Sequence, residues 1–148
     1  MVTIKNGDLF DATENIICHQ VNCFGGAGGL AHDMFERYPE AADEYYKSID
    51  TYRGATNTID LLGKAQIVEC SDGRYVANVF GQYYPGMDYR PEMLSAALSV
   101  VAEFAKENSM TVAIPFRISC GICGGDWDEV YRIIQEEFDG VECVIYKR

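Results

Sequence analysis

The chain has 148 residues, and 48% of them are apolar or aromatic, enough for the core of one folded domain spanning residues 1–148. Its 23 acidic and 12 basic side chains give a formal charge of −11, which excludes broad nucleic-acid binding because most of the surface repels a polyanion. A small anionic ligand is not excluded, because backbone N–H groups at helix starts hold phosphates without lysine or arginine.

The first twenty residues carry Asp8, Asp11 and Glu14 and contain no long apolar run. They predict neither a signal peptide nor a membrane span, so we expect a soluble, cytoplasmic protein without a membrane partner. In that reducing compartment the six cysteines are expected to be free thiols rather than disulfides.

The first predicted elements are a strand, a glycine-rich loop and two helices. Glu14 to Asn22 has a short apolar, β-branched centre, which predicts a buried strand, and the loop at 25–29 (GGAGG) follows it. Leu30 to Tyr38 places apolar residues at helical spacing, and Pro39 suits the first turn of a second helix. Asp50 to Asn57 is polar and predicts a surface excursion.

The middle of the chain predicts a hairpin, a helix and another buried strand. Ala65 to Cys70 and Arg74 to Gly81 are strand-like, and the Asp-Gly pair within residues 71–73 between them suits a tight hairpin turn. Pro91 to Glu107 carries one apolar stripe at helical spacing. The apolar run Met110 to Ile118 then predicts a strand that is buried on both faces.

A second glycine-rich loop, residues 119–125 (SCGICGG), leads into the last predicted helix. Asp126 suits its N-cap, and Glu129 three residues later resembles a capping box. The helix is expected to end near Phe138, with Val141 to Tyr146 as the final strand. Because helices and strands alternate around one hairpin, we expect a three-layer α/β/α sandwich with a mixed central sheet.

Both glycine-rich loops leave the end of a buried strand and enter a helix. Ligands of open α/β sheets bind beyond the carboxyl ends of the strands, where helix N-termini present unpaired N–H groups to anions. A single loop of this kind is more often only a tight turn. The pair of loops predicts a site that grips a diphosphate.

Other phosphate-binding patterns are excluded or disfavoured. Neither loop ends in Gly-Lys-Ser/Thr, which excludes a nucleotide-hydrolysing P-loop. Residues 26–31 fit a loose dinucleotide fingerprint, but no strand ending in an acid follows, so a hydride-transfer domain is disfavoured. A cysteine phosphatase needs a nearby arginine after its nucleophile, and none follows Cys23, Cys120 or Cys123 within the loops.

Several side chains near the loops are candidates for chemistry. His19 stands near the end of the strand and suits either a general acid or base or a packed, hydrogen-bonded histidine. Asn22 suits either a sugar hydroxyl or a loop cap. Cys120 and Cys123 supply only half a zinc site, so no metal is expected, and Cys123 is either a reactive thiol or a small residue filling a crowded loop.

Two further candidates suit a nucleobase. Asp8 lies beside the first strand and suits either the exocyclic amine of a base or a turn cap. Tyr146 on the last strand, or Phe10, Tyr83 or Tyr84, suits either stacking on adenine or a place in the core or rim.

In their joint order these segments resemble the macro domain family over nearly the whole chain. The matching segments are residues 4–9 (IKNGDL), 17–23 (ICHQVNC) with the first loop, 76–82 (VANVFGQ), and 114–127 with the second loop. The resemblance is greatest to the branch that contains the ADP-ribose 1''-phosphate phosphatases, near the terminal ADP-ribose glycohydrolases.

The resemblance implies that the ligand is ADP-ribose or a derivative of it. Asp8 and Tyr146 would contact the adenine, the two loops would wrap the diphosphate, and Asn22 would face the distal ribose. The implied ligand-binding residues are Asp8, Leu9, Gly25, Gly26, Ala27, Gly28, Gly29, Leu30, Ser119, Cys120, Gly121, Ile122, Cys123, Gly124 and Tyr146.

The resemblance also implies three alternative activities, none of which needs a cofactor. The first is phosphatase action on ADP-ribose 1''-phosphate, with His19 and Asn22 as the catalytic residues. The second is non-enzymatic binding of ADP-ribose or of an ADP-ribosylated protein, and the third is ADP-ribosyl hydrolysis. The lysine and aspartate of the glycohydrolase relatives fall at Gly81 or Gln82 and at Cys123, so their covalent mechanism is not implied.

Overall fold

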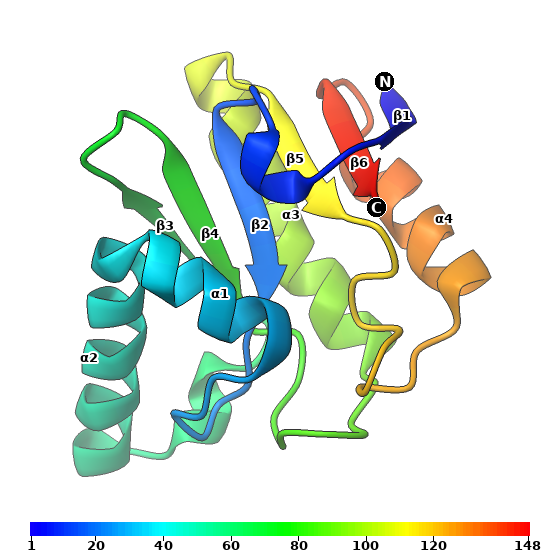
Figure 1. The fold of residues 1–148 in the computed structure, drawn as a ribbon. Helices are drawn as coiled ribbons and strands as arrows, with labels where there is room; N and C mark the ends of the chain where they lie inside the picture. The colour runs from blue at the N-terminus through cyan, green and yellow to red at the C-terminus, as the bar shows by residue number, and fades with distance from the viewer.

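The computed structural model describes residues 1–148 and contains one six-stranded mixed sheet (Figure 1). Five strands are parallel, and β3 is antiparallel to β4. From edge to edge the strands are β1 (Val2–Asn6), β6 (Cys143–Lys147), β5 (Val112–Pro115), β2 (Ile16–Gln20), β4 (Tyr75–Val79) and β3 (Ala65–Glu69).

Helices cover both faces of the sheet, which confirms the predicted three-layer sandwich (Figure 1). The helices α1 (Gly29–Arg37) and α2 (Pro39–Ala55) lie on one face, and α3 (Pro91–Asn108) and α4 (Trp127–Glu137) lie on the other. Two short 3-10 helices, η1 (Leu9–Asp11) and η2 (Thr58–Leu61), lie in the connections. None of the helices is long and apolar enough to cross a membrane.

Alternating side chains along the strands divide the core into two halves. On β2, Ile16 and Cys18 join the cluster under α3 and α4, whereas Ile17 joins the cluster under α1 and α2. On β5, Ile114 points to the first cluster and Ala113 to the second. Strands that are buried on both faces need apolar side chains at consecutive positions, which explains the continuous apolar runs in the sequence.

The predicted hairpin is confirmed as the antiparallel pair of β3 and β4. Its turn contains Gly73 at a φ of 86°, a left-handed conformation that favours glycine. The turn is closed by the Gly73 N–H, which donates to the Cys70 carbonyl, and by the Arg74 N–H, which donates to the Asp72 carboxylate.

Asp50 to Asn57 lies at the surface as predicted, but most of the segment is helical rather than a loop. The helix α2 continues to Ala55. Ile49 is buried and Tyr52, three residues on, is half-buried, so one side of the last turns packs while the polar side faces solvent. The polar residues of this segment therefore belong to the exposed face of a helix.

The predicted N-cap of α4 is confirmed, but the capping box is wrong. The Asp126 carboxylate accepts the Asp128 N–H at 3.0 Å. The Glu129 carboxylate accepts the Tyr89 hydroxyl at 2.6 Å and makes no bond back to the N-cap. Glu129 thus links the start of α4 to the segment before α3.

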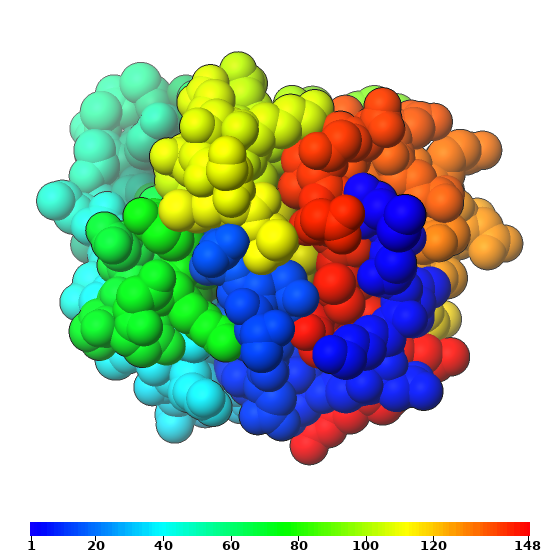
Figure 2. All heavy atoms as spheres, turned by 90° about the horizontal axis from the view of Figure 1, so that it is seen from above, coloured from blue at the N-terminus to red at the C-terminus, as the bar shows by residue number.

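The first and last strands lie side by side at one edge of the sheet (Figure 2). The parallel register pairs Val2 with Cys143 and Asn6 with Lys147. The amino terminus also donates to the Val141 carbonyl at 2.8 Å. All five parallel strands run in the same direction, and the loops that follow β2, β4 and β5 gather at one end of the molecule (Figure 1).

Shortening one core side chain of α3 tests the packing of this helix on the sheet. Leu98 is fully buried, so Leu98→Ala is expected to lower the free energy of unfolding by about 2–5 kcal/mol. Val100 lies two residues away and is exposed, so Val100→Ala is expected to change it by less than about 0.5 kcal/mol. Equal losses in urea denaturation would contradict the assigned helix face.

Candidate functional site

A cleft of about 440 Å³ lies beyond the carboxyl ends of the neighbouring strands β2 and β5. After β2 the chain passes to α1 on one face of the sheet, and after β5 it passes to α4 on the other. Two loops that diverge from adjacent strands leave a crevice between them, which is where open α/β sheets bind ligands. A third loop, between β4 and α3, borders the same cleft through Gln82, Pro85 and Gly86.

The first loop presents a run of backbone N–H groups without an acceptor. The N–H groups of residues 26–31 make no hydrogen bond within the protein, and five of these six residues line the cleft. The last three of the six are the first turn of α1, whose N-cap, Gly28, has no side chain to satisfy them. The positive end of the α1 dipole adds to this anion-binding character.

The second loop adds three consecutive unpaired N–H groups, from Gly121, Ile122 and Cys123, and all three residues line the cleft. The loop is bent by Arg117 and Ser119, whose φ angles of 63° and 69° are left-handed. Successive N–H groups in such turns form a concave anion site. Since Asp126 caps α4, the second loop contributes its own amides and not the N-terminus of the helix.

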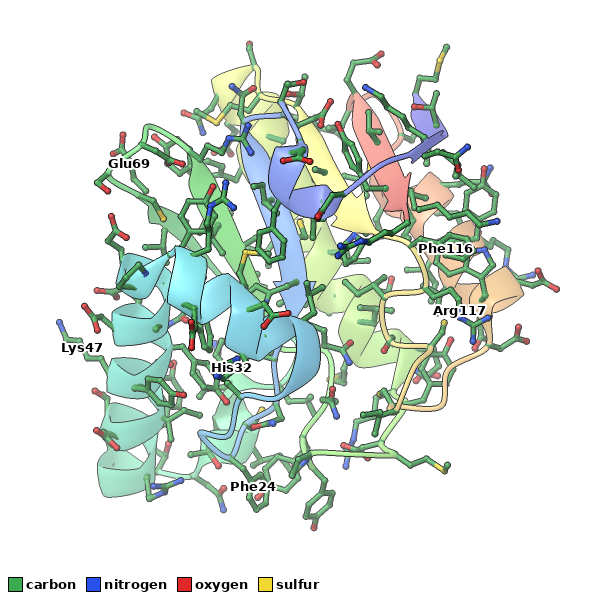
Figure 3. All side chains as sticks on the ribbon, in the orientation of Figure 1. Phe24, His32, Lys47, Glu69, Phe116 and Arg117 are labelled. Carbon is green, nitrogen blue, oxygen red and sulfur yellow. The ribbon has the colours of Figure 1, made fainter.

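Arg117 is the only charged residue among those that line the cleft, and its role was missed from the sequence. Its side chain is exposed, and one guanidinium nitrogen donates to the Cys120 carbonyl at 3.2 Å. Figure 3 labels Arg117 on the loop after β5, across the molecule from Phe24 on the loop after β2. A cation at this place favours an anion between the loops.

Neutral polar side chains form a chain of hydrogen bonds across the cleft. The Ser119 hydroxyl donates to Gln20 Oε1 at 2.8 Å, and Gln20 Nε2 donates to Gln82 Oε1 at 2.8 Å. Gln82 Nε2 in turn donates to the carbonyls of Tyr84 and Gly86. The chain therefore ties together the ends of β2, β4 and β5.

The glutamines were also missed from the sequence. β4 is parallel to β2, so the loop after β4 reaches the same carboxyl end of the sheet as the loop after β2. This parallel arrangement was the feature from which the position of Gln82 could have been predicted. The glycine at position 81 fits this arrangement closely, since a Cβ there would collide with the Gln20 amide.

Asn22 lines the cleft and fixes the shape of the first loop. Its Oδ1 accepts the Phe24 N–H at 2.9 Å and the Tyr45 hydroxyl at 3.0 Å. Its Nδ2 donates to the Gly26 carbonyl at 3.0 Å. The cap role is thus present in the structure, and contact with a ribose stays a prediction.

His19 does not reach the cleft, so the geometry gives no support to its predicted catalytic role. The side chain is fully buried under α1 and α2, and its ring is perpendicular to that of Phe35. Its Nε2 lies 2.7 Å from Asn78 Oδ1, and its Nδ1 has no partner. Burial lowers the pKa of His19 from 6.5 to about 4, only partly offset by the bond to Asn78, so the imidazole is neutral at pH 7.

Asp8 follows β1 and Tyr146 lies near the end of β6, and neither residue lines the cleft. The Asp8 carboxylate accepts the Phe10 N–H at 3.0 Å, the turn-cap arrangement, and lies 3.5 Å from the Arg148 guanidinium. Tyr146 is buried, and its hydroxyl donates to Glu14 at 2.6 Å. Their contacts with an adenine stay predictions.

The predicted site residues fall into two groups, those that line the cleft and those that do not. Those that line the cleft are Asn22, Gly26, Gly28, Gly29, Leu30, Ser119, Gly121, Ile122 and Cys123. Those that do not are Asp8, Leu9, His19, Gly25, Ala27, Cys120, Gly124 and Tyr146. Sequence order alone could not separate these groups, because the side of a loop that each residue faces depends on the backbone path of the loop.

The six cysteine thiols are free and buried. Cys123 lines the cleft, and the Ser119 hydroxyl lies 3.7 Å from its sulfur. Burial raises the pKa of the Cys120 thiol to about 11, so that thiol is protonated at neutral pH. No group of three or more histidine, cysteine or acidic side chains is placed to hold a metal ion.

Residues 18–134 match the macro domain family, and the chain belongs to that family. This stretch contains both glycine-rich loops and every residue of the cleft lining. No curated protein sequence matches the chain.

Solved structures share the fold over the whole chain. The macrodomain of Mycobacterium tuberculosis DarG is 26% identical over 100% of this chain and 98% of that one, with a TM-score of 0.85. A macrodomain protein from Streptomyces coelicolor is 28% identical over 100% and 99%, with a TM-score of 0.84. Thermosipho africanus DarTG, solved in complex with ADP-ribose, shares the fold at 16% identity, over 99% of this chain and 43% of its own, with a TM-score of 0.78.

The buried neutral state of His19 predicts a pH-dependent stability. In the unfolded chain the imidazole takes up a proton below about pH 6.5, whereas in the folded protein it does so only near pH 4. The free energy of unfolding should therefore fall by about 3 kcal/mol as the pH is lowered through this window. Urea denaturation at several pH values measures it.

Two glutamine variants separate this effect from other titrations. His19→Gln is expected to flatten the fall, because an amide can donate to Asn78 without taking up a proton. His32→Gln is the matched control and should keep the wild-type profile, because His32 is exposed on α1. A wild-type stability that does not change between pH 6.5 and 4 would contradict the assignment.

Proposed function

We propose that the chain binds ADP-ribose, or an ADP-ribosyl group attached to another molecule, in the cleft between the two loops. The observation that carries the proposal is the pair of unpaired amide runs, residues 26–31 and 121–123, which border one cleft from opposite sides. A diphosphate has acceptor oxygens on two adjacent phosphorus atoms, so it suits two such runs.

The electrostatics of the cleft support an anionic ligand. The protein as a whole carries a charge of −11, yet the lining contains no acidic side chain and one cation, Arg117. A phosphate entering the cleft therefore meets amide dipoles and a guanidinium rather than carboxylates. The cleft volume of about 440 Å³ falls within the range of about 300–1,000 Å³ found for small-molecule sites.

The order of the strands suggests which end of the ligand lies at which side of the cleft. Asn22 and the loop after β4 lie toward one side of the cleft, and the ends of β6 and β1 lie toward the other. In the proposed pose the distal ribose lies near Asn22, and the adenine lies toward Asp8 and Tyr146. The complex of Thermosipho africanus DarTG with ADP-ribose supports this class of ligand.

The lining favours binding without turnover over hydrolysis of ADP-ribose 1''-phosphate. It contains no histidine, carboxylate or lysine, so no ordinary general acid or base stands beside the ligand. The buried His19 cannot take part without opening the core between β2 and α1. The proposed function is therefore that of a reader of ADP-ribose.

A charge placed in the cleft tests the binding site. Gly26 lines the cleft, lacks a left-handed φ and has open space for 4 Å around the point where a Cβ would lie, so Gly26→Glu is compatible with the fold. Its carboxylate should repel the diphosphate and weaken ADP-ribose binding at least about tenfold in calorimetric titration.

Gly54→Glu is the matched control for that variant. Gly54 lies in α2, and it too has open space at its Cβ position and no left-handed φ, so the same net charge is added away from the cleft. Its ADP-ribose affinity should equal that of the wild type. Equal weakening in both variants, or no binding by the wild type at saturating ligand, would contradict the proposed site.

A phosphate-release assay tests the absence of turnover. Incubation of ADP-ribose 1''-phosphate with the wild type is expected to release no more phosphate than the same mixture without protein, which is the control. The reason is that the cleft lining contains no histidine, carboxylate or lysine, and the buried His19 has no access to the cleft. Release by the wild type above that control would overturn the reader proposal and support the phosphatase.

A further inference from the structure

Four large apolar side chains stand exposed around the mouth of the cleft. The exposed fractions are 43% for Phe24, 52% for Tyr84, 84% for Met87 and 82% for Ile122. They come from all three loops that border the cleft, after β2, β4 and β5. We call these four side chains the rim.

The rim residues adjoin lining residues in the sequence, and contacts link the three loops that carry them. Phe24 lies between the lining residues Asn22 and Gly26, and its ring centroid is 5.3 Å from that of Tyr84. Two lining residues, Pro85 and Gly86, separate Tyr84 from Met87 in sequence. Met87 lies against Gly124, two residues after Ile122, close enough that a Cβ on that glycine would be 3.0 Å from Met87 Cγ.

The loop that carries the middle of the rim is fixed by hydrogen bonds. The Asp88 carboxylate accepts the N–H groups of Tyr83 and Tyr84 at 2.8 and 2.9 Å, and it pairs with Arg90 at 3.0 Å. The Asp88 N–H donates to the Cys123 carbonyl, which ties this loop to the second glycine-rich loop. Because these bonds hold the backbone of the loop in place, the backbone loses little conformational entropy when a partner binds.

Single exposed apolar residues are ordinary, and the chain has others, such as Tyr46 and Val100 on the helices. The rim differs because its four side chains come from the three loops that border the cleft, where Phe24 contacts Tyr84 and Met87 approaches the second glycine-rich loop. Apolar groups gathered beside a binding cleft mark a contact surface for a partner.

We propose that the rim is a docking surface for a polypeptide that carries an ADP-ribosyl group on a segment rich in apolar and basic residues. The proposal rests on the function proposed above, since an ADP-ribosyl group seated in the cleft brings the segment that bears it to the mouth. Figure 3 shows Phe24 at the lower end of the molecule, beyond the end of β2, where such a segment would lie.

The chemistry of the rim and the net charge select this occupant. Met87 and Ile122 are aliphatic and suit the aliphatic side chains of a polypeptide, with the flexible methionine able to adapt to different sequences. The charge of −11 attracts lysine and arginine and repels a nucleic-acid strand. Exposed Asp126 and Asp128 follow the second loop, four and six residues after Ile122.

The test compares four ligands by calorimetric titration. They are free ADP-ribose, a peptide ADP-ribosylated on one serine with leucine and lysine flanks, the same peptide with glutamate and serine flanks, and a single-stranded oligonucleotide carrying the same group. The leucine-lysine peptide is expected to bind the wild type about tenfold more tightly than free ADP-ribose, as expected for burial of one or two apolar side chains.

The double variant Tyr84→Ser, Met87→Ser is expected to remove this tenfold gain and to keep the wild-type affinity for free ADP-ribose, since neither side chain lines the cleft. Its matched control is Tyr46→Ser, Val100→Ser, which changes two side chains that are 42% and 40% exposed on the helices. The control should keep the gain. A similar loss of the gain in both double variants would overturn the proposal.

Other outcomes also overturn the rim as assigned. These are equal binding of the peptides and free ADP-ribose, equal binding of the two peptides, tighter binding of the oligonucleotide, and a dimer in sedimentation that disappears in the rim variant. If free ADP-ribose does not bind, the proposed function fails separately. The Met87 methyl NMR signal with unmodified peptides then decides: a shift caused only by the leucine-lysine peptide supports the rim, and no shift overturns it.

Discussion

The parallel pairing of β2 with β5 is the contact on which the rest of the site depends. The register joins Ile16 to Val112 and Ile17 to Ala113, so the two neighbouring strands start at the same level, run in the same direction and release their loops side by side. Since α1 and α4 lie on opposite faces of the sheet, the loops must part as they leave it. The two apolar clusters that flank the sheet hold this divergence in place. The cleft is thus a result of strand order, and the glycines allow the loops to follow it.

Much of this arrangement could be predicted from the sequence, because it depends on local patterns. The apolar runs predicted the buried strands, the Asp72-Gly73 turn predicted the hairpin, and the glycine-rich loops were placed correctly between strands and helices. The packed, hydrogen-bonded role of His19 was one of two predicted roles, and the sequence could not choose between them because the burial depends on Phe35 and Asn78, which other elements bring to it. The contributions of Gln82 and Arg117 to the cleft likewise depend on the conformations of loops that no periodic pattern describes.

The polar interior of the molecule is divided between two separate networks with different consequences. His19, Asn78 and Gln66 lie on the α1 and α2 side and join strand side chains to the Ala41 carbonyl. Gln20, Gln82 and Ser119 lie at or beyond the carboxyl ends of β2, β4 and β5, and their hydrogen bonds connect these three strand ends. The first network belongs to the core and makes stability depend on protonation, whereas the second borders the ligand cleft and contains no group that titrates near neutral pH. His19 and Gln20 are adjacent in sequence, but His19 belongs to the core network and Gln20 to the network beside the cleft.

The unpaired amides of residues 26–31 and 121–123 also bear on how such a site is inherited. Every residue except proline supplies the same N–H group, so the anion-binding groups are encoded by the path of the backbone and not by the identity of the side chains. Genetic drift can replace Ala27 or Ile122 without deleting a single one of these donors, and only proline or a residue that bends the loop differently removes them. Relatives can thus diverge widely in sequence while keeping the same phosphate cradle, and the side chains around its mouth are free to specialise for different partners.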